Sequence, residues 1–403
     1  MNVHVARQPI FDKNMNVFAY ELLYRSEEGF NDDKDGNQKT GEVVFNTLVN
    51  LGLDNMLGGK KAFINFTKET IDDELPKMFS NDILVVEILE DVIPDDMFME
   101  QCRMLKQQGY VLALDDFDSS YTYEDVVGLV DIIKVDFLST TVRERAELIS
   151  KYNRFNVKFL AEKVETKDEF EEAIKLGYDY FQGFFFSKPV LVSGNDFRMF
   201  NNTYLLLLSE LNKEEPSYDL LEDIVKKDFS ITFKLLKLVN SAAFYSRNRI
   251  TTIRHSLTML GFKELKKWFS LLMIRDIGDE QPKELTRMSL IRAKMLEAMM
   301  KQTELKQYAS EGFLIGLLSL ADVILDRRMD EIIVDIPLDE EIIHALYRDP
   351  GLFTDLLIVT EKYEKGDWTD IKLLIEPYRM DFLDVSNYYL EAIDWVNIIE
   401  STK

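Results

Sequence analysis

The sequence predicts an α/β fold for the first half of the chain and an all-α fold for the second half. In the first half, short apolar segments of strand length alternate with helical segments, each pair taking about 25 to 30 residues. About eight such strands within fewer than 200 residues are typical of a compact TIM-like (β/α)8 barrel rather than an open sheet. Beyond Pro189 the alternation stops and helical periodicity takes over. We therefore expect a barrel at residues 1–195 and a helical domain at residues 196–403.

The expected barrel begins with two β-rich runs separated by the turn-like Asp12-Lys13-Asn14. Such a hairpin predicts that the first strand runs antiparallel to the rest, unlike in a regular barrel. The predicted strands are 3–11, 17–24, 62–66, 83–88, 111–114, 131–135, 157–161 and 180–186. Helices are predicted at 42–51, 69–79, 95–107, 142–152 and 168–176, with a further helix-like stretch between the strands at 111–114 and 131–135.

The second half is expected to consist of helices. Leu235, Leu236, Val239 and Ala243 recur at helical spacing and mark one buried face. Helices are predicted at 197–211, from 218 onward, and at 285–306, 310–324 and 340–347, with more helix in the C-terminal tail.

Composition excludes several classes of protein. The net charge of −24 argues against direct binding to nucleic acid phosphates and against adhesion to an anionic membrane. Cys102 is the single cysteine, so no intramolecular disulfide can form, which fits the cytoplasm. The three histidines are far apart in sequence, which disfavours a histidine zinc site. We expect neither a signal peptide nor a membrane span.

Polar residues recur late in, or just after, the predicted strands. They are Glu21, Asn65, Glu87, Asp115, Asp116, Lys134, Glu162 and Gln182. Because the C-terminal ends of barrel strands face one mouth, we expect these side chains to share a pocket. So many carboxylates would repel one another unless cations neutralised them. The pattern therefore predicts two divalent cations and metal-dependent hydrolysis of a phosphate ester. The alternatives are that Asp115 and Asp116 begin a turn or cap a helix, or that the acidic groups form a solvated face.

Ordered short motifs over residues 3–192 resemble the EAL domain family, the bacterial cyclic-di-GMP phosphodiesterases. Gln8-Pro9-Ile10 resembles the opening QPI, and the run from Glu21 to Arg25 stands where E-A-L-x-R belongs, with leucine in place of alanine. The further matches are Asn65, Glu87 to Glu90 (E-x-x-E), Asp115 to Phe117 (DDF), Lys134 to Asp136 (K-I-D), Ala161 to Thr166 (A-E-G-V-E-T) and Gln182 to Phe184 (Q-G-Y).

The resemblance implies a role for each matched residue. Glu21, Asn65, Glu87 and Asp115 would bind a first Mg²⁺ or Mn²⁺ ion, and Asp115, Asp116 and Glu162 would surround a second. Lys134 would orient or activate the attacking water, with Glu162 or a metal-bound hydroxide as the base. Supporting or substrate-binding roles would fall to Gln8, Arg25, Glu90, Glu165 and Gln182. The reaction would open cyclic-di-GMP to the linear dinucleotide pGpG.

Two departures from the family pattern bear on catalysis. The loop after DDF, at Asp118 to Tyr123, lacks the family's glycines, which permit backbone conformations that other residues resist. In the family this loop helps to couple dimerisation to metal binding, so a homodimer through the barrel is expected on the same resemblance. Lys163 replaces the glycine after Glu162 and adds a cation that could pair with a carboxylate or a phosphate, or point to solvent.

The second half resembles the HDOD domain, an all-α relative of HD phosphohydrolases that lacks their His-Asp metal pair. The resembling residues are Asp228 to Leu236, Val239 to Phe244 and Leu260 to Phe262. His255 and His344 are each followed by a residue other than aspartate. Asn240 and Ser241 could bind a ligand, although a helix cap or a buried contact is the simpler interpretation. We expect this half to bind an unidentified protein partner.

Three functions are consistent with the sequence. The leading hypothesis is a two-metal cyclic-di-GMP phosphodiesterase with a helical signalling domain. The alternatives are a sensor that binds cyclic-di-GMP without cleaving it, and a protein-interaction adaptor that ignores the nucleotide.

Overall fold

The computed structural model describes residues 3–26, 56–119, 121–183, 202–240, 250, 252–277, 283–325, 328–335 and 338–401. The chain divides into two compact units. The first comprises Met1–Lys188 together with the C-terminal segments Glu361–Lys372 and Asp381–Lys403, and the second comprises Pro189–Thr360 and Leu373–Met380.

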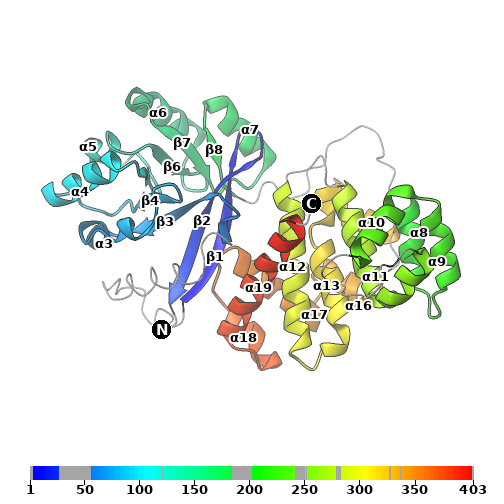
Figure 1. Cartoon of the computed structure of the whole chain (residues 1–403). Coiled ribbons are helices and arrows are strands. Elements are labelled where there is room, and N and C mark those ends of the chain that lie inside the picture. Colours follow the sequence, from blue (N-terminus) through cyan, green and yellow to red (C-terminus); the bar gives the residue numbers. More distant parts are fainter. Residues whose placement is uncertain are drawn as a thin grey trace. The chain divides into compact units, whose positions relative to one another are not determined.

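The first unit is a closed barrel whose eight strands follow one another in sequence order (Figure 1). The strands are β1 (Val3–Asp12), β2 (Val17–Ser26), β3 (Lys61–Phe66), β4 (Leu84–Ile88), β5 (Val111–Leu114), β6 (Ile132–Asp136), β7 (Lys158–Glu162) and β8 (Tyr180–Phe181). Strand β1 runs antiparallel to both β2 and β8, and the remaining neighbours are parallel. The predicted TIM-like barrel and its antiparallel first strand are confirmed.

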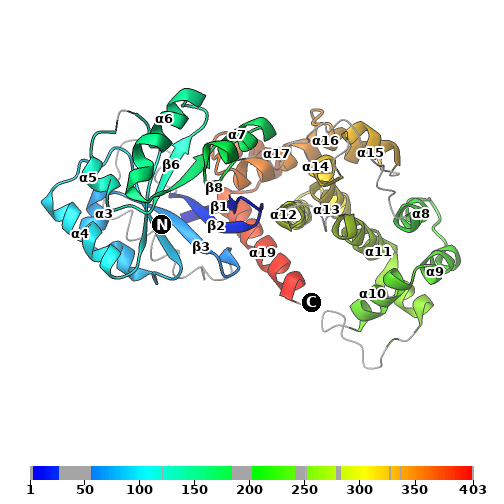
Figure 2. The same ribbon diagram turned by 90° about the horizontal axis from the view of Figure 1, so that it is seen from above.

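Helices connect the parallel strands on the outside of the barrel (Figure 2). They are α3 (Lys68–Asp72), the 3₁₀ turn η2 (Leu75–Met78), α4 (Asp96–Gln107), α5 (Glu124–Val127), α6 (Val142–Tyr152), the 3₁₀ turn η3 (Asn153–Phe155) and α7 (Lys167–Leu176). Capping boxes begin α6 at Thr141 and α7 at Thr166, where each threonine side chain accepts the backbone N–H of the glutamate three residues on.

The predicted helix at 69–79 is broken in the structure. Glu74 adopts a left-handed conformation with φ of 60°, and Pro76 lacks the backbone N–H that a continuing helix needs. The chain therefore forms the short helix α3 and then the turn η2. The predicted helix at 42–51 and the end of the strand at 180–186 lie outside the described residues.

One layer of apolar side chains fills the interior of the barrel, with one residue from each strand. These are Ile10, Ala19, Phe63, Val85, Ala113, Ile132, Leu160 and Tyr180, all buried. Large and small residues alternate irregularly around this layer, and Phe18 stacks on Tyr180 with ring centroids 4.1 Å apart. The layer closes the barrel below the site and fixes which face of each strand points inward.

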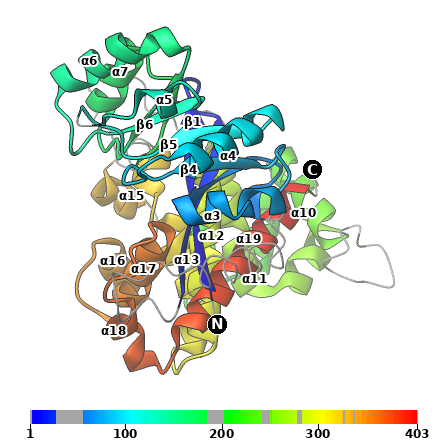
Figure 3. The same ribbon diagram turned by 90° about the vertical axis from the view of Figure 1, so that its left-hand side faces the viewer.

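The C-terminal part of the chain returns to the barrel. Helix α19 (Phe382–Ser401) packs beside β1 (Figure 3), where the ring of Phe382 lies edge-on to His4 with centroids 4.4 Å apart. Ser386 hydrogen-bonds the same imidazole, and Tyr363 donates its hydroxyl to the Val5 carbonyl. The predicted domain at 196–403 did not anticipate this return, which arises because aromatic side chains of the C-terminal segments bury themselves against β1.

The second unit consists of helices. These helices are α8 (Asn202–Leu211), α9 (Tyr218–Lys226), α10 (Phe229–Val239), α11 (Ile253–Ile277), α12 (Lys283–Lys301), the 3₁₀ turn η6 (Lys306–Tyr308), α13 (Ala309–Leu318), α14 (Ala321–Leu325), α15 (Met329–Asp335), α16 (Glu340–Leu346) and α17 (Leu352–Glu364), whose residues 361–364 belong to the first unit. Near the C-terminus, α18 (Ile371–Ile375) and the 3₁₀ turn η7 (Glu376–Tyr378) precede α19. Helices α12 and α13 pack closely, and α11 contacts α8, α9 and α10.

Helix α11 is interrupted at Gly261, whose φ of 74° and ψ of 162° are not helical. Glycine carries no penalty in this conformation, so the residue marks a bend between two helical segments. Among the helices of the described residues, none combines the length and hydrophobicity required to cross a lipid bilayer.

Candidate active site

The site is the next layer of side chains above the apolar layer of the barrel. Residues two positions apart on a strand face the same side of a sheet. The residue two positions from each apolar interior residue, toward the mouth, is polar in all eight segments. In strand order these residues are Gln8, Glu21, Asn65, Glu87, Asp115, Lys134, Glu162 and Gln182. The strand period therefore places all eight at one level.

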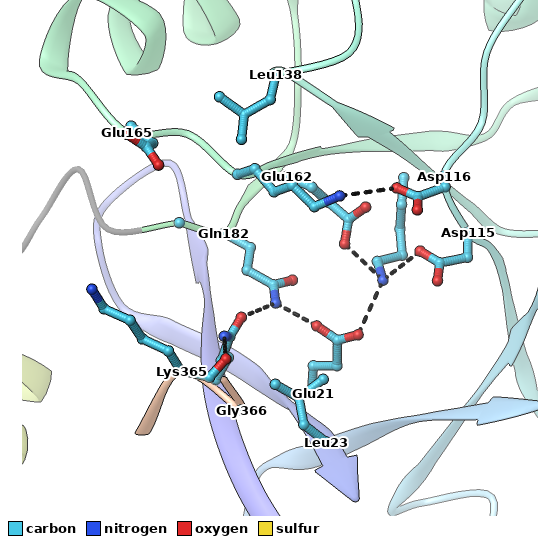
Figure 4. Close-up of a pocket in the computed structure, with 14 residues that line it drawn as sticks. Glu21, Leu23, Asp115, Asp116, Leu138, Glu162, Glu165, Gln182, Lys365 and Gly366 are labelled. Atoms are coloured by element: carbon cyan, nitrogen blue, oxygen red, sulfur yellow. Dashed lines mark hydrogen bonds and ion pairs between the residues drawn. The ribbon is translucent and has the colours of Figure 1, made fainter. Parts of the chain in front are cut away.

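The carboxylates of Glu21, Asp115 and Glu162 point toward one another (Figure 4), and Lys134 lies among the carboxylates of this layer. Its Nζ atom is 2.7 Å from Asp115 Oδ1, 2.7 Å from Glu162 Oε1 and 3.4 Å from Glu21 Oε1, and it also contacts Glu87. Only 1% of the lysine side chain is exposed. One buried ammonium thus faces four carboxylates, which leaves an excess of negative charge.

The pKa values in this cluster are strongly perturbed. Burial opposes the charge of Lys134, but the four carboxylates outweigh it, so the pKa of Lys134 rises well above its usual value. Burial also raises the pKa of Glu87 well above its usual value, and the nearby carboxylates add to this effect, while Lys134 opposes it. For Glu162, burial and the charges of Asp115 and Glu21 raise the pKa to about 8, against the opposing charge of Lys134. The layer therefore favours any bound cation that replaces protons.

Two overlapping groups of carboxylates have the spacing of metal ligands. Glu21, Glu87 and Glu162 form one group, and Asp115, Asp116 and Glu162 form the other, each with ligand oxygens within 4.8 Å of one another. Within the described residues, the buried Oε2 of Glu87 and Oδ1 of Asn65 have no hydrogen-bond partner, and Asn65 is paired with Glu87 in the β3–β4 register. Unpaired buried oxygens beside clustered carboxylates fit a hard divalent cation.

Lys163 lies beside the second carboxylate group, the one that contains Asp116. Its Nζ is 2.6 Å from Asp136 Oδ2 and 3.6 Å from Asp116 Oδ1. Both Lys163 and Asp116 have positive φ, at 53° and 37°, a region that side chains other than glycine rarely adopt. The pKa of Asp116 is raised by burial and by the negative charges of Asp115 and Asp136, and it is lowered by the positive charge of Lys163. Of the possibilities left open by the sequence, the structure shows that Lys163 pairs with carboxylates.

A chain of amides supports Glu21 from the side of β1. Gln182 donates from Nε2 to Gln8 Oε1 at 3.0 Å and also to Glu21 Oε2. Gln8 and Glu21 face each other in the antiparallel β1–β2 pair. Gly183, the residue after Gln182, has φ of 149°, and a Cβ atom there would overlap the Val164 carbonyl. Glycine at this position therefore lets the β8 end approach the β7 loop closely enough for Gln182 to reach Glu21.

These side chains line a cavity of about 420 Å³. Its lining residues include Gln8, Glu21, Asp115, Asp116, Lys134, Glu162, Lys163, Glu165 and Gln182, as well as Leu23, Leu138, Gly183, Lys365 and Gly366. The sequence reasoning missed Lys365 and Gly366. Glycine at the end of an apolar helical stretch signals a helix terminus, but no local pattern places that terminus at the mouth of a barrel.

Two of the predicted supporting residues, Glu165 and Glu90, stand apart from the carboxylate layer. Glu165 lines the cavity but lies away from the carboxylates in Figure 4. Glu90 lies in the turn after β4 and is largely exposed; partial burial, with the charges of Asp116 and Asp115, raises its pKa. Arg25, near the end of β2, lies opposite His4 in the register of the β1–β2 pair. The structure does not describe the Arg25 side chain. The roles assigned to these residues stay predictions.

Comparisons with known proteins identify the family. A model of the EAL domain matches residues 45–189, and a model of the HDOD domain matches residues 198–338. The chain is 37% identical, over the full length of both, to the uncharacterized protein YuxH of Bacillus subtilis (strain 168). It is 32% identical to the cyclic di-GMP phosphodiesterase CdgJ of Vibrio cholerae serotype O1, over 97% of this chain and 92% of that protein. This chain belongs to the EAL–HDOD protein family.

Solved structures of EAL proteins are more distant. The Bacillus subtilis YkuI protein, in complex with substrate c-di-GMP and calcium, is 18% identical with a TM-score of 0.40, over 58% of this chain and 72% of that chain. The Klebsiella pneumoniae BlrP1 calcium/cy-diGMP complex is 23% identical with a TM-score of 0.37, over 47% of this chain and 56% of that chain. Family membership therefore rests on the full-length relatives.

The HDOD domain shows structural roles for the residues singled out in its sequence. The Asn240 side chain donates to the carbonyls of Leu236 and Ile250 and accepts the Ile250 N–H at 2.9 Å, which ties the end of α10 to residue 250. His255 is exposed, and His344 pairs with Asp349 at 2.8 Å. Within the described residues, the carboxylate groups with metal-ligand spacing lie in the EAL domain alone.

Proposed function

We propose that the chain is a metal-dependent cyclic-di-GMP phosphodiesterase that opens one phosphodiester of the cyclic dinucleotide to give linear pGpG. The observation that carries the proposal is the polar layer at the barrel mouth, in which buried Lys134 contacts four carboxylates and two ligand groups share Glu162. Membership of a family that includes a cyclic di-GMP phosphodiesterase supplies the substrate class.

The donor set favours two divalent cations, Mg²⁺ or Mn²⁺. Glu21, Asn65, Glu87 and Asp115 would hold the first ion, and Asp115, Asp116 and Glu162 the second. These donors are oxygen atoms, which suit hard cations, and the partnerless oxygens of Asn65 and Glu87 fit the first position. When bound, such ions supply positive charge to the phosphoryl oxygens and lower the pKa of water.

Residues of the chain handle the water and its proton. Lys134 donates hydrogen bonds from within the carboxylate layer and would orient the attacking water toward phosphorus. Glu162, whose Oε1 lies 2.7 Å from Lys134 Nζ, would accept the proton of that water. The water oxygen bonds to phosphorus, the bond between phosphorus and the 3′ oxygen breaks, and that oxygen takes up a proton. Gln182 and Gln8 would keep Glu21 in place through their hydrogen bonds.

A binding-only sensor is the second candidate, and one observation favours it. Lys163 stands where the family pattern has glycine, and its ammonium already pairs with Asp136 and lies 3.6 Å from Asp116. A fixed cation there competes with a second metal ion for the Asp116 carboxylate. In that case the barrel would bind cyclic-di-GMP and report its presence to a protein partner of the HDOD domain.

Turnover separates the two candidates. Purified full-length protein is incubated with cyclic-di-GMP and either Mg²⁺ or Mn²⁺, and the products are resolved by chromatography. We expect a linear dinucleotide that disappears with EDTA and with Glu21→Gln, and that persists in the matched control Glu171→Gln, whose carboxylate is half exposed on α7. Absence of product with both metals, together with measurable nucleotide binding, would exclude the enzyme and establish the sensor.

A further inference from the structure

One wall of the cavity in the EAL domain comes from a segment that begins about 180 residues after the last barrel strand. Lys365 and Gly366 line it together with the barrel residues, and both belong to the segment Glu361–Lys372, which is part of the barrel unit. We call these residues the C-terminal wall. The barrel motifs therefore do not make up the whole cavity.

The C-terminal wall has a defined local structure. At the end of helix α17, the N–H of Asp367 bonds to the Lys362 carbonyl at 2.9 Å and the N–H of Gly366 to the Tyr363 carbonyl at 3.0 Å. With Gly366 at φ of 64°, this is the Schellman arrangement that ends many helices. The carbonyl of Lys365 then points out of the helix, where Gln8 Nε2 donates to it at 2.8 Å.

The same hydrogen bond connects the wall to the site. Gln8 accepts from Gln182, which also donates to Glu21. On the other side of Gly366, the Leu23 side chain lies so close that a Cβ atom would overlap it. Tyr363 is fully buried and anchors the segment by donating its hydroxyl to the Val5 carbonyl at 3.2 Å. The position of the wall is thus set by contacts with both β1 and β2.

Three lysines line the cavity, and they differ in where they lie within it. Lys134 is enclosed by the four carboxylates, and Lys163 pairs with Asp136 and Asp116. Lys365 is exposed, and its ammonium lies on the opposite side of the cavity from Asp115 and Asp116 (Figure 4). A cyclic dinucleotide carries two phosphodiesters. If one lies at the carboxylate layer, the other needs a cation elsewhere in the cavity.

We propose that the C-terminal wall completes the substrate site and that Lys365 binds the phosphodiester that is not cleaved. The proposal rests on the proposed function, because it assumes that cyclic-di-GMP occupies this cavity. It assigns a substrate-binding residue to a segment that neither domain model covers, since these end at residues 189 and 338. Binding through Lys365 holds the nucleotide without contacting the reacting phosphorus, so it affects KM rather than kcat.

The first test replaces Lys365 in the full-length protein. With Lys365→Met we expect KM to rise on the order of tenfold, with kcat within about twofold, the loss expected for one charge-assisted contact. Equilibrium dialysis with cyclic-di-GMP should show the same change in Kd. Lys365→Arg should restore both values, and the control Lys175→Met, a lysine on α7 with 78% side-chain exposure, should change neither.

The second test moves the wall by changing Gly366. Gly366→Ala combines a left-handed backbone with an overlap onto Leu23, whereas the control Gly177→Ala has φ of 100° and no atom within 4 Å of its added Cβ. Of these two variants, we expect only Gly366→Ala to raise KM. Adding Leu23→Ala to it should bring KM to the value of the Leu23→Ala variant.

The outcomes separate this inference from the proposed function. Wild-type turnover with an unchanged KM and Kd for Lys365→Met would overturn the inference and leave the phosphodiesterase intact. Absence of wild-type turnover would reject the phosphodiesterase, and a raised Kd for Lys365→Met would then still support the inference. Absence of both turnover and binding would overturn both. A variant that loses kcat and thermal stability together, without rescue by arginine, would assign Lys365 a structural role and overturn the inference.

Discussion

Replacing Lys134 by methionine tests the electrostatics of the polar layer. Methionine keeps most of the side-chain volume but removes the ammonium that contacts four carboxylates and is only 1% exposed. Breaking a buried ion pair by removing one partner typically costs about 3 to 5 kcal/mol. We expect the lower end, about 3 kcal/mol, because the carboxylates that lose the ammonium can take up protons, which relieves part of their repulsion.

Hydrogen exchange with mass spectrometry measures this loss within the barrel alone, which matters because a chain of two units does not unfold in one step. In EDTA, peptides that cover β5 and β6 should exchange roughly a hundred times faster in Lys134→Met than in the wild type, the factor that corresponds to about 3 kcal/mol. Mn²⁺ should restore most of the protection, because bound cations would supply the missing positive charge.

Lys163→Met is the matched control. Its side chain is 48% exposed and pairs with the same acidic region, and an exposed ion pair contributes at most about 1 kcal/mol. The peptides that cover β5 and β6 should therefore exchange less than about fivefold faster in Lys163→Met than in the wild type. The reasoning is refuted if Lys134→Met in EDTA exchanges like the wild type, or if both lysine variants lose equal protection.

Three further predictions concern other parts of the chain. Gly183→Ala should lower the melting temperature and reduce cyclic-di-GMP affinity together, because its Cβ would overlap the Val164 carbonyl and push the β8 end from the site; unchanged nucleotide binding would contradict this. In the HDOD domain, burial opposes the charge of Glu297, but Lys267 and its neighbours lower the pKa to about 2 from an ordinary 4.5. This carboxylate stabilises the fold above pH 4.5 and loses that effect as pH falls toward 2, so the gap in melting temperature between the wild type and Glu297→Gln should narrow over that range; a constant gap would count against it. Burial raises the pKa of the Cys102 thiol to about 12, so Ellman's reagent should label it after unfolding in urea and leave it unlabelled in the native protein.

Much of the site could be predicted from the sequence because strands repeat every two residues. Seven of the eight polar residues of the layer follow an apolar interior residue at that spacing, and Gln8 precedes Ile10 because β1 is antiparallel, so the local pattern indicates which side chains face inward. The sequence also marked Lys163 as a departure from the family pattern. It did not indicate that Glu162 belongs to both carboxylate groups, since that depends on how closely β2, β4 and β7 approach across the barrel.

The sequence by itself determined the fold class, the antiparallel first strand and seven of the eight residues of the polar layer, because strand and helix periods and turn residues are local properties. Only the tertiary structure decided that Lys134 sits among four carboxylates, that Gln8 on β1 meets Gln182 after β8, and that Lys365 reaches the cavity. These contacts depend on the closure of the barrel and on the return of the C-terminal segment. Barrel closure and the return of the C-terminal segment both bring together residues that are far apart in the chain. The aromatic side chains that direct this packing do not repeat at a regular interval in the sequence.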